Sequence, residues 1–209
     1  MDERTGLRER KKHRTREAIS NAALELFFEH GFDQVSISRI AQAAEVSRRT
    51  LFAYFPAKED LVLHRIADHR TESARIVRDH PDAPLDALRA HFMDGLDRRD
   101  PITGLCDVPA AVALYRLIMG TPSLAAGMLR YREASEVALA DALRPHLPGL
   151  NARLAAAQIM AVQWLLAEDN QRLIADGTSA DEAYPAAVDA AGQGFDLLSA
   201  GLGRALSSG

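Results

Sequence analysis

The stretch GFDQVSISRIAQAAEVSRRTLFAYFPAKEDL (31–61) determines how the N-terminal part of this chain folds. Ser36 is a good N-cap for a short helix. Apolar residues follow it at helical spacing: Ile37, Ile40, Ala41 and Ala44. Glu45-Val46 predicts a tight turn, after which Ser47 caps another helix that Pro56 ends. Two short helices behind a longer one, joined by a turn of a few residues, are the skeleton of a helix-turn-helix.

The second of these helices, residues 48–55, has one apolar and one polar side. On a wheel of 100° per residue with Leu51 facing inward, Phe55 lies on the same side and Arg49 points outward, with Thr50 on the flank. Such a helix can enter a major groove about 12 Å wide. Arginine suits bidentate recognition of guanine, and a threonine methyl packs on a thymine methyl. The pattern therefore predicts base reading by Arg49 and Thr50, and a phosphate contact by Tyr54.

Together with the basic segment LRERKKHRTREAISNAALELF (7–27), this stretch closely resembles the DNA-binding domain of the TetR family. The elements G-F, a capping Ser/Thr, I-A, V-S-x-x-T-L, Y-F and K-E-x-L stand in order. The resemblance implies an all-helical homodimer that pairs through its last two helices. It also implies a small-effector pocket among the middle helices, and release of a palindromic operator when ligand tilts the reading heads. Repression is the usual mode of the family.

Carried over by position, the resemblance implies phosphate or base contacts for seven residues: Ser36, Ser47, Arg48, Arg49, Thr50, Tyr54 and Lys58. Several positions depart from the family pattern. Glu45 stands at the usual glycine of the turn, Phe52 at a usual tyrosine, and Ala57 where Ser or Asn often caps the next helix. Arg49 stands where a small residue is common, so guanine reading by Arg49 rests on its chemistry alone. For the basic segment 8–16 we weigh contact with the DNA backbone or minor groove against a solvated tail.

Helical periodicity continues through the rest of the chain, and no period-two strand is evident. The fold class is therefore all-α, with a helix-turn-helix domain over 1–56 and an effector-binding and dimerisation domain over 57–209. Gly31 is a natural terminator for the first helix, and Ser179 and Glu182 stand at capping-box spacing. About nine helices are predicted, near residues 7–30, 37–44, 48–55, 58–80, 84–98, 105–119, 122–144, 151–175 and 179–205.

Charge and composition agree with a DNA-binding head on an acidic body. The net charge of −4 divides into +3 for residues 1–58 (11 basic, 8 acidic) and −7 for residues 59–209 (14 basic, 21 acidic). The single cysteine, Cys106, fits a reducing compartment. The N-terminus lacks the apolar run of a signal peptide, and no segment approaches a membrane span. We expect a cytoplasmic protein without a membrane partner.

Two further surfaces are predicted in the C-terminal part. A small-residue face for dimerisation is indicated on the last two helices by Leu154, Ala157, Ala161, Trp164, Leu165, Ala187, Ala190, Ala191, Gly194, Phe195 and Leu198. A pocket for a largely hydrophobic effector is indicated by adaptable apolar residues: Phe92, Met93, Tyr115, Met119, Met128, Tyr131, Met160 and Trp164.

Two other function classes remain open alternatives. A non-specific DNA-binding protein is expected to carry a positive net charge, and the net charge of −4 argues against this function. A helical enzyme could use His64 and Asp68, which are spaced to share a metal on one helix face. However, no third ligand follows at fixed spacing, and no phosphate loop, nucleophile elbow or HExxH motif is present. We therefore expect no enzymatic activity, no cofactor and no metal.

Overall fold

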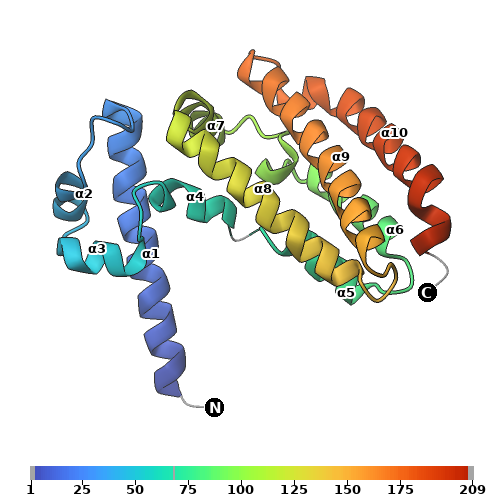
Figure 1. Cartoon of the computed structure of the whole chain (residues 1–209). Helices are drawn as coiled ribbons and strands as arrows, with labels where there is room; N and C mark the ends of the chain where they lie inside the picture. The colour runs from blue at the N-terminus through green and yellow to red at the C-terminus, as the bar shows by residue number, and fades with distance from the viewer. Residues whose placement is uncertain (1–2, 68, 207–209) are drawn as a thin grey trace. The chain divides into compact units, whose positions relative to one another are not determined.

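The structure, a computed structural model, describes residues 3–67 and 69–206, without the side chains of residues 3–9 and 203–205. The described residues form helices and no strand, which confirms the all-α fold class (Figure 1). In chain order the helices are α1 (Glu3–His30), α2 (Ile37–Ala43), α3 (Arg48–Tyr54), α4 (Asp60–Ala67), α5 (Glu72–Asp79), α6 (Pro84–Asp97), the 3₁₀-helix η1 (Pro101–Thr103), α7 (Pro109–Gly120), α8 (Pro122–Leu143), α9 (Leu150–Ala175) and α10 (Ala180–Leu206).

The chain forms two compact units. The first comprises Met1–Arg65 with Leu117–Gly127, and the second comprises Ile66–Arg116 with Met128–Gly209. The first unit therefore contains α1 to α3, and the second contains α5, α6, α9 and α10. The functional division into residues 1–56 and 57–209 stays a prediction.

In the first unit α1 is the scaffold on which α2 and α3 lie. Its inward stripe is fully buried at Ile19, Ala23 and Phe27, because these residues recur at helical spacing. The helix ends where predicted: Gly31 takes a φ of 81°, and its N–H donates to the carbonyl of Phe27 at 2.9 Å. The N-terminal part of α1 continues past α2 and α3 (Figure 1).

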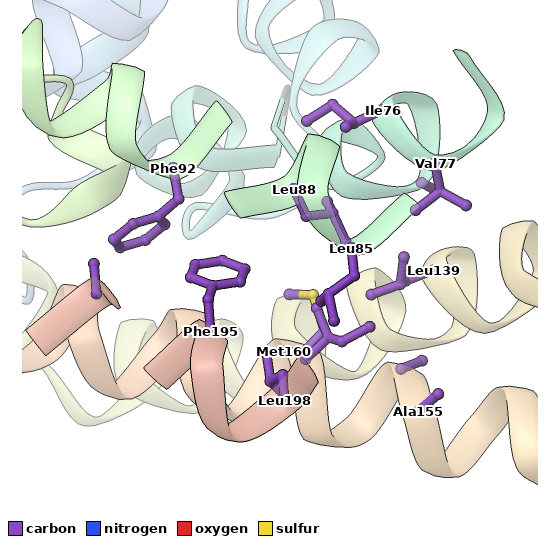
Figure 2. Packing of buried hydrophobic residues seen from close by; sticks show 14 of the residues in the cluster. Ile76, Val77, Leu85, Leu88, Phe92, Leu139, Ala155, Met160, Phe195 and Leu198 are labelled. Carbon is purple, nitrogen blue, oxygen red and sulfur yellow. The ribbon is translucent and has the colours of Figure 1, made fainter. Parts of the chain in front are cut away.

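The core of the second unit is formed by α6, α9 and α10 together with buried residues of α5 and α8. Phe92 of α6 and Phe195 of α10 face each other with ring centroids 6.0 Å apart (Figure 2). Gly194 lets α10 approach α9, since a Cβ there would lie 2.9 Å from Val162. The capping box that begins α10 is confirmed, because Ser179 N–H donates to Glu182 and Glu182 N–H donates back to the Ser179 hydroxyl.

The segment 58–80, predicted as one helix, contains α4 and α5 separated by turns at residues 69–71. The backbone tightens there, because the N–H groups of His69, Arg70 and Glu72 donate three residues back instead of four. No proline or glycine marks this break in the sequence. The helical periodicity of apolar residues therefore continues across it and predicts one helix.

The prediction of a dimerisation face on α10 is partly wrong. Ala187, Ala191, Phe195 and Leu198 are buried inside the same chain. Of the small-residue set on this helix, Ala190 remains exposed. Helical periodicity identifies a buried stripe but does not reveal whether the chain itself or a second subunit covers it.

Candidate nucleic-acid interface

The two short helices of the first unit begin at the serines predicted to cap them. The N–H of Arg39 donates to Ser36 Oγ at 3.2 Å, and the N–H of Thr50 donates to Ser47 Oγ at 3.0 Å. Both serines have extended backbone conformations, as N-caps do. Each hydroxyl is exposed at the start of its helix, where backbone N–H groups attract anions.

The turn between α2 and α3 is a Schellman motif. The N–H of Val46 donates to the carbonyl of Ala41, and the N–H of Glu45 donates to Gln42. Glu45 occupies the left-handed position with a φ of 53°. Glycine is the usual residue at this position, so Glu45 maintains the turn at a cost in backbone strain.

Helix α3 divides into a buried and an exposed side, as the wheel predicted. Leu51 and Phe55 are 0% exposed and hold the helix on the unit. Arg48 and Arg49 are exposed, and among the described residues no carboxylate pairs with either. Tyr54 is half-buried at the edge. The two guanidinium groups are therefore available to bases and phosphates.

The hydroxyls of Ser47 and Thr50 form a hydrogen bond to each other at 2.7 Å. Thr50 is half-buried beside the exposed arginines, and its hydroxyl is thereby held in one orientation. This leaves the threonine methyl as the group that suits an apolar contact with a thymine methyl. Base reading by Thr50 stays a prediction.

Lys58 lies in an anchored position between α3 and α4. Its ammonium donates to the carbonyl of Phe32 at 2.5 Å and lies 4.5 Å from the centroid of the Phe32 ring and 5.6 Å from that of Phe27. Partial burial lowers the pKa of Lys58, while Asp33 and Glu59 act in the opposite direction. Lys58 thus fastens the 31–36 turn to the start of α4, and its phosphate contact stays a prediction.

Arg39 is a basic side chain of this unit that was not singled out from the sequence. Arg39 on α2 is exposed, and its guanidinium donates to His30 Nε2 at 2.6 Å. Of the basic segment 8–16, which the sequence did indicate, Lys11, Lys12 and Arg14 on α1 are exposed. The side chain of Arg8 lies outside the described residues. From the sequence, only the place of Arg39 three residues after the Ser36 cap could have suggested it.

His64 is placed inside the first unit. Its ring packs edge-on against Phe55 at 5.0 Å, and Nε2 lies 3.6 Å from Glu17. Asp68, its partner in the enzyme alternative, lies outside the described residues. Among the described side chains, no group of three or more His, Cys, Asp or Glu is arranged to hold a metal ion.

The predicted effector-pocket residues are spread over both units. Met119 is exposed and belongs to the first unit. In the second unit Phe92 is core, Tyr131 packs edge-on against Trp164 at 5.7 Å, and Met93, Tyr115 and Met128 are half-buried. The structure brings Met160 and Trp164 together in a groove of about 460 Å³ between α8 and α9, here called the α8–α9 groove.

Comparison with known proteins identifies the family. Residues 19–64 match the family described as "Bacterial regulatory proteins, tetR family". The chain is 38% identical over 138 residues to the HTH-type transcriptional regulator TcmR of Streptomyces glaucescens, covering 65% of this chain and 61% of TcmR. It is 33% identical over 149 residues to the HTH-type transcriptional repressor Rv3405c of Mycobacterium tuberculosis, covering 70% of this chain and 69% of that repressor. This chain belongs to the TetR family.

Solved structures agree with the TetR-family assignment at the level of the fold. The chain aligns with SmeT in its complex with triclosan at a TM-score of 0.58 and 18% identity, over 90% of each chain. It aligns with NalD of Pseudomonas aeruginosa, a repressor of a multidrug efflux pump, at a TM-score of 0.58 and 20% identity, over 88% of this chain and 96% of NalD. The match to TcmR spans about three fifths of that relative's length.

Within the part that the structure describes, no single helix has the length and apolar character to cross a membrane. The pair α7 and α8 meets that requirement only when its two helices are combined across a 99° bend.

Proposed function

We propose that this protein is a transcriptional repressor that binds a palindromic operator as a homodimer and is released by a small, largely apolar effector. One observation carries the DNA-binding part: α3 is fixed by buried Leu51 and Phe55 and presents Arg48 and Arg49 without acidic partners among the described residues. A helix of this kind is the reading element of a helix-turn-helix.

Exposed leucines on α9 and α10 support pairing with a second copy. Leu154 and Leu165 of α9 are 50% and 60% exposed, and Leu197 of α10 is 74% exposed. Exposed apolar side chains on adjacent helices are typical of an interaction surface. One chain supplies one reading helix, so two chains related by a two-fold axis match the two half-sites of a palindrome.

Operator binding is tested by fluorescence anisotropy with labelled DNA from upstream of the protein's own gene, in 50 to 300 mM salt. A specific repressor retains its complex when random competitor DNA is added, and its affinity falls steeply with salt. Exposed Lys11, Lys12 and Arg14 favour a second candidate function, non-specific DNA binding. Complete loss of the complex to random competitor would support that second function and reject the first.

Dimerisation is tested with Leu197→Glu, measured by light scattering after size-exclusion chromatography. The variant places a carboxylate in the proposed interface and should give a monomer with weakened operator binding. Leu129→Glu on α8 is the matched control, because Leu129 is 66% exposed and lies on neither pairing helix. A dimer that withstands Leu197→Glu but not Leu129→Glu would place the interface elsewhere.

A further inference from the structure

The α8–α9 groove combines an apolar wall with an excess of negative charge. Met160, Ala161, Trp164 and Leu165 from α9 form much of the apolar wall. Ala161 and Leu165 are exposed, so solvent reaches the groove. Aromatic and thioether groups beside a solvent opening suit an apolar molecule of drug size.

The charged part of the lining comes from both helices and is mostly acidic. Glu133 and Glu136 of α8 line the groove with Glu168 of α9 and Arg132, and Glu168 already pairs with Arg172 at 2.8 Å. Among the described residues, no basic side chain forms an ion pair with Glu133 or Glu136. These two carboxylates without a basic partner favour a ligand that brings positive charge.

Arg132 shows that the groove already holds a cation at its aromatic wall. The guanidinium carbon lies 4.8 Å from the centroid of the Trp164 ring, which is cation–π distance. Its ion pair with Glu168 is long, at 3.9 Å, and Arg132 Nε is buried without a hydrogen-bond partner. The indole Nε1 of Trp164 is likewise buried and unpartnered. Arg132 is thus incompletely satisfied where it lies, and a better-fitting cation can displace it at modest cost.

We propose that the α8–α9 groove binds an organic cation with an apolar, aromatic body, which replaces the Arg132 guanidinium over Trp164 and is neutralised by Glu133 and Glu136. The role of this cation as the releasing effector rests on the function proposed above, whereas the binding itself does not. The inference narrows the effector from largely apolar to apolar and positively charged. In a dimer paired through α9, the second subunit would border the Ala161 and Leu165 side and enclose the ligand further.

The test uses two probes of the same shape and opposite charge, tetraphenylphosphonium and tetraphenylborate, titrated into the full-length protein without DNA. Trp164 is the only tryptophan of the chain, so its emission reports the groove directly. The phosphonium should change this emission in a saturable way, with the borate binding at least about tenfold more weakly because of the carboxylates. Equal binding of both probes would overturn the proposal.

Variants assign the binding to the groove. Glu133→Gln combined with Glu136→Gln should weaken phosphonium binding roughly threefold to tenfold, and Arg132→Gln should strengthen it, because the internal competitor is gone. Asp189→Asn on α10 is the matched control, since Asp189 is exposed and outside the groove. Thermal unfolding confirms that each variant is folded. Unchanged affinity in the double variant would reject the site.

Two further readouts separate this inference from the proposed function. Operator binding is measured by anisotropy in the same preparations, so a protein that binds DNA but not the phosphonium contradicts the groove proposal alone. A protein that binds the phosphonium but no operator contradicts the repressor proposal alone. If Trp164 emission responds to protein concentration and not to the probe, a second copy fills the groove and the proposal fails.

Discussion

The ammonium of Lys58 lies 2.5 Å from the carbonyl oxygen of Phe32 and bridges two segments that are far apart in the sequence. This contact fixes the turn that precedes α2 to the residues that precede α4. The position of α3, which lies between these two segments in the sequence, therefore depends on a lysine that the sequence pattern associates only with phosphate.

Replacement of Lys58 by methionine should lower the free energy of unfolding by about 1–2 kcal/mol, because the Phe32 carbonyl loses a charge-assisted hydrogen bond. Urea unfolding followed by circular dichroism measures the effect. Lys12→Met, at an exposed position on α1, is the control and should be neutral. Equal stability of both variants would mean that the Lys58 contact contributes nothing.

Arg49→Ala should weaken operator binding by about 1–3 kcal/mol and relax sequence preference at one position of each half-site. The reason is that its guanidinium is exposed on α3 and suits bidentate recognition of guanine. Arg14→Ala on α1 should instead weaken binding to all sequences alike. Competition among operators with single base changes distinguishes the two. An unchanged preference profile for Arg49→Ala would remove this residue from the reading surface.

Glu45→Gly should stabilise the protein by about 1 kcal/mol, because glycine adopts a φ of 53° without the steric cost that a side chain brings. Gln42→Gly, on the exposed side of α2, is the paired control and should destabilise by about 1 kcal/mol. The melting temperatures of the two variants should move in opposite directions. A lower melting temperature for Glu45→Gly would show that the glutamate side chain stabilises the turn.

Glu72→Gln should destabilise the second unit by about 1–2 kcal/mol near pH 6. The Glu72 carboxylate pairs with His69 at 2.8 Å and with His91 at 3.2 Å, and hydrogen bonds from these two rings hold the pKa of Glu72 far below its usual value of 4.5. A carboxyl whose pKa is lowered by folding stabilises the protein above its unfolded pKa, and the contribution is lost as the pH falls through the folded pKa.

The difference between wild type and Glu72→Gln should therefore be largest above pH 4.5 and shrink as the pH decreases below it. Chemical unfolding between pH 3 and 7 measures this profile. Asp189→Asn, an exposed carboxylate with no ion pair among the described residues, should give a profile parallel to wild type. A constant difference for Glu72→Gln over the whole range would contradict the pairing.

Signals confined to a few neighbouring residues predicted the first unit well. The caps at Ser36 and Ser47, the terminator Gly31 and the buried side of α3 are confirmed, because each depends on local backbone geometry or on a single helical face. The resemblance to the TetR family, based on the same stretch, is confirmed as well.

Features that depend on contacts distant in the sequence were not predictable. The attachment of Lys58 to Phe32 joins two loops, and no pattern within either loop indicates it. No signal in the sequence singles out Glu133 and Glu136, because only the packing of α9 beside α8 brings them into one groove with Trp164. The apolar stripe on α10 was predicted to pack against a second subunit, but it packs within its own chain. The sequence of α10 alone does not show which of the two covers it.

The continuity of α1 over its 28 residues limits how its basic end can touch a duplex. A helix with side chains is about 10 Å across, whereas the minor groove is only about 6 Å wide. Where α1 crosses the minor groove, Lys11, Lys12 and Arg14 therefore meet the duplex mainly at its phosphates, which carry no information about base sequence. Their effect would be to prolong residence on DNA of any sequence and to favour sliding toward the operator, without changing which operator is chosen.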